Sequence, residues 1–236
     1  MYEGLGDSEH ARLLASVAEQ LKVPLMSIAR QAELHELTDM GGKADMAGIR
    51  TQADAALVLV DSYLLGLQLL RDQAMLDVEP VSVSSLLVEV AHELERFAKQ
   101  YGVRLELQIA GRYGPVMAHR VGLKAALVSL GYGIIEAQSA STARTVMLAT
   151  HRTPKGIITG LYGAREPLAA ADWRKALALC GQANQPFTGL SASSAAGVFV
   201  AHTILQAMES RLRVGKRLKQ YGFAMTLQPS QQLQFV

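Results

Sequence analysis

The chain has 236 residues, of which 50% are hydrophobic, and its formal net charge is only +2. That composition can bury the core of one large domain or two small ones, and it excludes a disordered tail protein. The charge is too small to indicate nucleic acid or an acidic membrane surface, and only the run Arg211 to Lys219 is locally basic, which we interpret as a solvated strand pair.

The first predicted element is an amphipathic helix from Asp7 to about Glu36. Its apolar residues recur at steps of three and four, which is the spacing of one helix face: Leu14, Val17, Leu21, Leu25, Ile28 and Ala32. Pro24 falls inside this stripe, where a proline costs a helix about 3 kcal/mol. Such a residue calls for a specific explanation.

A second amphipathic helix follows a break at residues 37–45, which contains Gly41 and Gly42. Its stripe consists of Met46, Ile49, Ala53, Leu57, Val60, Leu64 and Leu67. Two such helices joined by a glycine turn form an antiparallel hairpin. Within one hairpin, each apolar stripe can pack against only one other helix, which cannot fully cover it. We therefore expect residues 10–70 to pair with a second copy in a homodimeric four-helix bundle.

Residues 76–80 (LDVEP) end this helix, and we place a domain boundary there, between residues 1–76 and 77–236. The second part mixes helical with alternating patterns. We predict helices at 83–102, 120–136, near 172–180 and at 198–209, and strands at 103–109, 145–150, 157–162, 212–214 and 222–227. The expected fold class is α+β, with the helices on one face of a sheet.

Cys180 is the only cysteine, so the chain has no internal disulfide and no pair of thiolates for a zinc site. The most apolar run, residues 57–70, is too short to cross a bilayer, and the N-terminus lacks the basic residues of a signal peptide. The six histidines show no metal-ligand spacing. A cytoplasmic location fits these features.

Residues 19–25 (EQLKVPL) resemble the signature of a sensor histidine kinase, in which a phosphoaccepting histidine precedes Glu-Leu-Arg/Lys-Thr-Pro-Leu. The match is at Leu21, Lys22, Pro24 and Leu25. The resemblance covers nearly the whole chain: a helical hairpin for dimerisation and phosphotransfer, then a domain similar to the ATP-binding domain of that family. It implies that the proline bends the helix one turn below the acceptor position.

The acceptor position itself holds Glu19. At about 100° per residue this side chain lies opposite the apolar stripe and points outward, as an acceptor must, but a glutamate cannot form the phosphoramidate that this chemistry uses. His92 begins a similar string, yet Phe97 stands in place of its proline. His10 and His35 have the wrong spacing from Pro24, and we interpret them as surface residues.

The resemblance also implies a nucleotide site, which needs an asparagine for Mg²⁺ and phosphate, an aspartate for the adenine amino group, and glycines beside the phosphates. Gly133 falls at the asparagine, Thr159 at the aspartate, and Gly163 is the retained glycine of the first loop. Between Asp77 and Asp172 the chain has no Asp and no Asn.

In the second glycine-rich segment only Gly197 is retained, with Ser193 and Ala195 at the sister positions. Glu136 could offer an oxygen to a metal, but we interpret it as solvated surface at a helix end. Tyr162 and Trp173 could stack on a base, although single aromatic residues more often belong to a core. We therefore expect neither ATP nor Mg²⁺ to bind.

The leading hypothesis is a non-catalytic, histidine-kinase-like signalling protein that acts by binding. Its expected partners are itself, the receiver domain of a response regulator docking beside Glu19, or another histidine kinase. A fixed carboxylate there only crudely imitates a phosphorylated side chain. One alternative is an active kinase or phosphotransferase that uses another histidine. A third hypothesis, a nucleic-acid-associated regulator, would use Arg211 to Lys219.

Overall fold

A computed structural model describes residues 27–28, 43–72, 76–111, 114–139, 141–164 and 192–230, with the backbone alone at 43–47, 71 and 192–196. Apart from residues 27–28, which are helical, the first predicted helix lies outside these ranges. The predicted helix near residues 172–180 lies outside them as well. So do His10, His35, Trp173 and Cys180.

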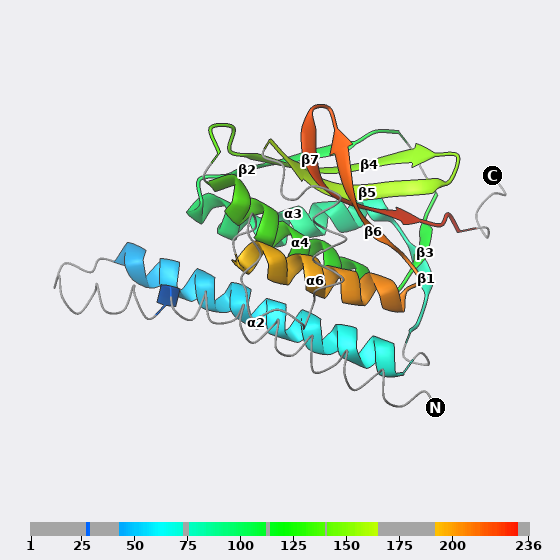
Figure 1. Cartoon of the computed structure of the whole chain (residues 1–236), viewed down its shortest axis with the longest axis horizontal. Coiled ribbons are helices and arrows are strands. Elements are labelled where there is room, and N and C mark those ends of the chain that lie inside the picture. Colours follow the sequence, from blue (N-terminus) through cyan, green and yellow to red (C-terminus); the bar gives the residue numbers. More distant parts are fainter. Residues whose placement is uncertain are drawn as a thin grey trace.

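A five-stranded sheet forms one layer, and the helices pack on one of its faces (Figure 1). In order across the sheet the strands are β2 (Arg104–Ile109), β4 (Thr145–Thr153), β5 (Gly156–Gly163), β7 (Gln220–Leu227) and β6 (Leu212–Arg217). Only β2 and β4 are parallel, and the other neighbours are antiparallel. The predicted α+β class, with helices on one face of the sheet, is confirmed.

A second, two-stranded sheet was not expected from the sequence. It pairs β1 (Glu79–Val81) with β3 (Val116–Ala118) in antiparallel register. Three residues are too few to show the alternation that indicates a strand, and Pro80 argues against one except at an edge. Both strands are therefore set by tertiary contacts and not by local pattern.

Helix α3 (Val83–Gln100) begins at Ser82, whose hydroxyl accepts a hydrogen bond from the Ser85 backbone N–H at 3.4 Å. Serine is a favoured residue at this position because it satisfies a donor that the first turn leaves unpaired. The apolar face is buried, and it includes Leu86, Leu87, Val90, Leu94 and Phe97. Each of these side chains would contribute about 1.5–3 kcal/mol by burial.

Helix α4 (Arg120–Ser139) is buried on most of its circumference. One of its sides packs on the inner face of the sheet, which contributes Leu148, Leu161 and Phe223 to the core, and its other sides contact the other helices. Helix α6 (Ala192–Ala207) packs beside it. α4 is therefore the central element of the core.

Helix α2 (Lys43–Arg71) packs along α4 and α6, on the side of those helices away from the sheet (Figure 1). It begins inside the predicted break at residues 37–45, directly after Gly41 and Gly42. Its inward side belongs to the same core as the sheet, through Ala55, Leu59, Tyr63 and Leu69. Two residues of the predicted stripe, Leu57 and Leu64, are 61% and 50% exposed. The helix thus presents a second apolar side.

The prediction that the apolar run is too short for a bilayer needs correction. Residues 48–70 form a helical stretch of 23 residues that contains an 18-residue window with mean hydropathy 1.5, and by length and composition it could cross a membrane. One such helix is weak support for a membrane span, because a core helix meets the same criteria. Here one side of the stretch packs against α4 and α6.

Candidate functional site

The phosphoacceptor-like motif of Glu19, Leu21, Lys22 and Pro24 lies outside the described residues. Its interpretation therefore stays a prediction. The positions predicted for the nucleotide site fall within the described ranges, except for the side chains of Ser193 and Ala195, which belong to the first turns of α6.

Thr159, at the predicted aspartate position, is on β5 and faces the helices. Its side chain is fully buried and donates a hydrogen bond to the hydroxyl of Thr150 on β4 at 3.1 Å. The pair joins two neighbouring strands at opposed register positions. At the position that the resemblance assigns to the aspartate, the chain thus has a hydroxyl that bonds within its own sheet.

The two glycines assigned to the first part of the site lie on different elements. Gly133 is buried within α4, and it carries no side chain that could bind a metal or a phosphate. Gly163 ends β5, where the side chain of Gln138 of α4 packs against it: a Cβ at Gly163 would be 2.4 Å from the Gln138 Cδ. The structure therefore gives Gly163 a packing role.

Gly197 lies in α6, at a close contact with α4. A Cβ at this residue would be 1.9 Å from the backbone oxygen of Ser129 on α4. Real Cβ atoms do not approach an oxygen so closely, so the helices could not pack at this distance with any side chain there. The structure accordingly assigns this glycine to helix packing, a role that sequence analysis did not foresee.

The string of residues that begins at His92 lies on α3. His92 has a side chain that is 88% exposed, 3.9 Å from Glu95. Phe97 is buried, with its ring centroid 4.7 Å from that of Tyr132 and 4.8 Å from that of Tyr101. The phenylalanine is a core residue within a regular helix, so the string has no counterpart of the proline bend.

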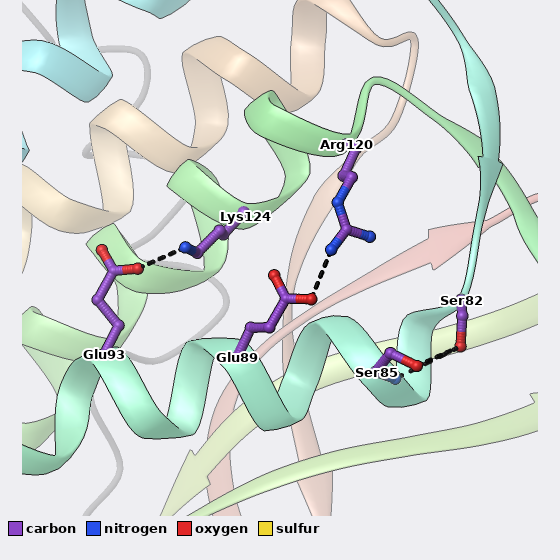
Figure 2. A network of polar contacts seen from close by, with 6 residues as sticks. All are labelled: Ser82, Ser85, Glu89, Glu93, Arg120 and Lys124. Carbon is purple, nitrogen blue, oxygen red and sulfur yellow. Dashed lines mark hydrogen bonds and ion pairs between the residues drawn. The ribbon is translucent and has the colours of Figure 1, made fainter.

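Two ion pairs connect α3 with α4 beside that string (Figure 2). Arg120 donates to Glu89 at 2.5 Å, and Lys124 lies 2.8 Å from Glu93. All four side chains are between 32% and 41% exposed, so each pair contributes at most about 1 kcal/mol. Their spacing of one helical turn fixes the relative register of the two helices.

On the outer face of the sheet, Tyr162 is 3% exposed and packs with Met147, Ala149 and Ala224. Burial raises the pKa of its phenol, and the nearby Arg217 acts in the opposite direction. The interpretation of this tyrosine as a packed residue is confirmed. The run Arg211 to Lys219 forms β6 and the turn after it, which confirms the strand-pair interpretation.

Comparison with protein-family models and with curated proteins found no match. Solved structures are similar over most of the chain. Histidine kinase AdeS of Acinetobacter baumannii aligns over 88% of this chain and 96% of its own, at 17% identity and a TM-score of 0.53. Histidine kinase ThkA, in complex with response regulator protein TrrA, covers 92% of this chain at 14% identity and a TM-score of 0.57. The chain has the fold of a histidine kinase core.

The match with ThkA uses 61% of that chain. Full-length ShkA in complex with AMPPNP covers 90% of this chain and 46% of its own, at 17% identity and a TM-score of 0.50. At such low sequence identities the similarity establishes the fold of the histidine-kinase-like core. The chemistry of its site depends on the residues of this chain.

Glu136 is not the solvated surface residue that the sequence predicted. It lies on α4 and is only partly exposed, and burial raises the pKa of its carboxyl to about 7. Desolvation disfavours the charged form, which explains the direction. Within the described ranges, no three His, Cys, Asp or Glu side chains gather into a metal-binding group. The expectation that no metal binds stays a prediction.

A pH-dependent stability follows from Glu136. Its native pKa of about 7 exceeds the unfolded value of 4.5, so between these values the native state binds more protons and unfolding becomes easier as pH rises. We expect Glu136→Gln to leave stability unchanged near pH 4.5 and to raise it by about 2 kcal/mol above pH 7, after allowance for partial exposure. Denaturant titrations at the two pH values measure this. Glu79→Gln, at an exposed residue, is the control, and equal pH slopes for wild type and Glu136→Gln would contradict the assignment.

Proposed function

We propose that the chain is a non-catalytic, histidine-kinase-like signalling protein that acts by protein binding in a two-component or phosphorelay pathway. The observation that carries the proposal is the buried hydroxyl pair of Thr150 and Thr159, which closes the position where the resemblance requires a base-binding carboxylate. The absence of any Asp or Asn between Asp77 and Asp172 supports it, because neither residue type that the resembled site requires occurs in this stretch.

The proposed partner is the receiver domain of a response regulator. ThkA, which shares the fold, was solved in complex with a response regulator protein. In this chain the docking position would be the helical hairpin beside Glu19, where a carboxylate stands in place of a histidine. We place the division between hairpin and second domain near residue 76 and the protein in the cytoplasm.

The deciding experiment for the absence of catalysis adds millimolar ATP and magnesium to the full chain and follows its melting temperature. A ligand in hundredfold excess over its Kd would raise the free energy of unfolding by about 2.7 kcal/mol. We expect an unchanged melting temperature, because neither Gly133 nor Thr159 supplies the ligand atom that the site needs. A rise of several degrees would overturn the non-catalytic assignment.

The binding part is tested separately with the purified receiver domains of the native host. We expect one of them to bind the full chain, and Glu19→Lys to weaken that binding by reversing the charge at the docking position. Glu209→Lys, at an exposed residue after α6, is the control. If no receiver domain binds, the assignment to this pathway fails even when the ATP result holds.

We further propose that the chain is a homodimer through the hairpin. Leu57 and Leu64 lie two helical turns apart on the same side of α2, and both are largely exposed in the single chain. A second copy would bury them in the four-helix bundle.

Replacing both leucines by glutamate should therefore dissociate the dimer without unfolding the chain. Because these side chains are exposed in the single chain, their replacement should reduce its stability little, whereas the bundle would bury two unpaired charges. Light scattering at tens of micromolar should give a dimer mass for wild type and a monomer mass for the double variant. Val121→Glu, at a 61% exposed valine on α4, should stay dimeric. A monomeric wild type would contradict the proposal.

A further inference from the structure

The hairpin of β6 and β7 carries positive charge that the rest of the described chain does not balance. Together with Arg211 directly before β6, it contains Arg213, Lys216, Arg217 and Lys219, and no acidic residue follows Glu209 in the sequence. On the helices and β2, by contrast, Lys99, Arg104, Arg120 and Lys124 each lie within 2.8 Å of a carboxylate. Among the described residues, none of the five hairpin cations forms an ion pair.

The end of this hairpin is held in a fixed position above the outer face of the sheet. Arg217 is the last residue of the edge strand β6, yet it donates to Gln108 of β2, the opposite edge, at 2.9 Å. It also lies 2.8 Å from the Nδ1 atom of His151 on β4. Gly215 and Gly222 are paired in the ladder, and a Cβ at Gly222 would be 1.9 Å from the Leu161 backbone oxygen. The hairpin therefore bends across the sheet, on the side away from α2 (Figure 1).

The turn itself holds residues that its backbone does not favour. Leu218 and Lys219 have φ values of 48° and 67°, between the paired residues Arg217 and Gln220. A two-residue turn of this hand normally contains glycine or asparagine, because a side chain at positive φ is strained. Leu218 is nevertheless 69% exposed, the highest value among the large hydrophobic side chains that are described.

Charge alone explains only part of this arrangement. Lysine and arginine on an edge strand prevent unwanted strand pairing, and that role accounts for the cations. It does not account for an exposed leucine at a strained position, and neither would contact with the phosphates of a nucleic acid. An apolar anchor surrounded by charges is instead the composition of a protein-binding hot spot with its polar rim.

We propose that the hairpin tip, residues 216–219, docks on an acidic surface of a second protein. Leu218 enters an apolar socket of that protein, and Lys216 and Lys219 face carboxylates around it. Lys216 already lies 5.0 Å from the centre of the Tyr221 ring, which limits its freedom. Because the tip is on the far side of the sheet from α2, the docked protein would leave the helical hairpin free, and the chain would hold two partners at once.

The test identifies the partner and then measures its affinity. A photo-crosslinking phenylalanine in place of Leu218 captures the partner in the native host, and the captured protein, once purified, is the probe for titrations against the full chain. We expect Leu218→Asn to weaken binding by at least about tenfold, which corresponds to the loss of one buried aliphatic side chain. The double variant Lys216→Glu/Lys219→Glu should weaken it by a similar factor and reduce its salt dependence.

The asparagine variant separates docking from folding. Because asparagine tolerates positive φ, Leu218→Asn should keep or raise the melting temperature while it loses the partner. Matched controls elsewhere are Val121→Asn, at another exposed apolar side chain, and Lys155→Glu, at the turn after β4; both should bind as wild type does.

Three results would overturn the inference: equal affinity of Leu218→Asn and wild type, no crosslinked protein, or a Leu218-dependent binding of random-sequence DNA or of phosphatidylserine vesicles in place of protein. Receiver-domain binding at the helical hairpin should be unaffected by the tip variants. Failure of the receiver titration therefore leaves this inference standing, and failure of the tip titration leaves the receiver proposal standing.

Discussion

Gly197→Val should unfold the chain or destabilise it by more than about 4 kcal/mol, the range reserved for severe core disruption. The valine Cβ would be placed 1.9 Å from the Ser129 backbone oxygen. The obstacle is helix backbone, which cannot rotate away as a side chain could. Relief requires α6 to move off α4, and this would open the core around Val198, Ala201 and Leu205.

Circular dichroism and chemical denaturation of the full chain measure this effect. Gly114→Ala is the matched control, since a Cβ there meets no atom within 4 Å, and it should change stability by less than about 0.5 kcal/mol. If Gly197→Val were as stable as wild type, the close contact between α4 and α6 would be contradicted. Gly197 would then be explained only by the resemblance, as the retained glycine of the second glycine-rich segment.

The sequence predicted most of the helices and strands of the second part because their patterns are local. The three-four spacing in Val83–Gln100 has one buried side, the alternation of Val103–Ile109 places Leu105 and Ile109 against the core, and the structure contains both elements. The strands β1 and β3 could not be found in this way, because three-residue strands have too few positions for a pattern.

Other features could not be predicted because the sequence has no local signal for them. The turn at Leu218 and Lys219 is one, since a two-residue hairpin turn is recognised from glycine or asparagine at these positions. Glutamate is a residue type that usually lies at the surface, and only the packing around α4 shows that Glu136 is partly buried. Arg217 reaches Gln108 across 109 positions of sequence, a contact that no local pattern can indicate.

The predicted nucleotide-site positions illustrate the same limit more sharply. The sequence shows that Thr159 and Gly133 lack the ligand atoms of the resembled site, but it does not show what replaces them. The structure places a strand-to-strand hydroxyl pair at Thr159 and the Gln138 side chain against Gly163. If the non-catalytic proposal is right, these contacts are what a core gains once a polar ligand no longer has to be accommodated.

Thr159→Asp tests that idea with a large expected effect. Restoring the carboxylate of the resembled family should destabilise the chain by about 3–5 kcal/mol, because it leaves an unpaired charge in a fully buried position. Thermal denaturation measures the loss. Thr159→Val, which removes only the hydrogen bond to Thr150, should cost about 1 kcal/mol, and Thr142→Asp, at an exposed residue, should be nearly neutral.

Addition of ATP to the Thr159→Asp variant separates the two functional hypotheses. In an active nucleotide site the adenine amino group would donate to the new carboxylate, and binding would recover much of the lost stability. In this chain the aspartate would face the buried Thr150 hydroxyl, at the register position where β4 and β5 pair. We therefore expect millimolar ATP and magnesium to leave the lowered melting temperature unchanged. Recovery of several degrees would show that the fold still opens a base pocket at this position, and the non-catalytic proposal would then be wrong.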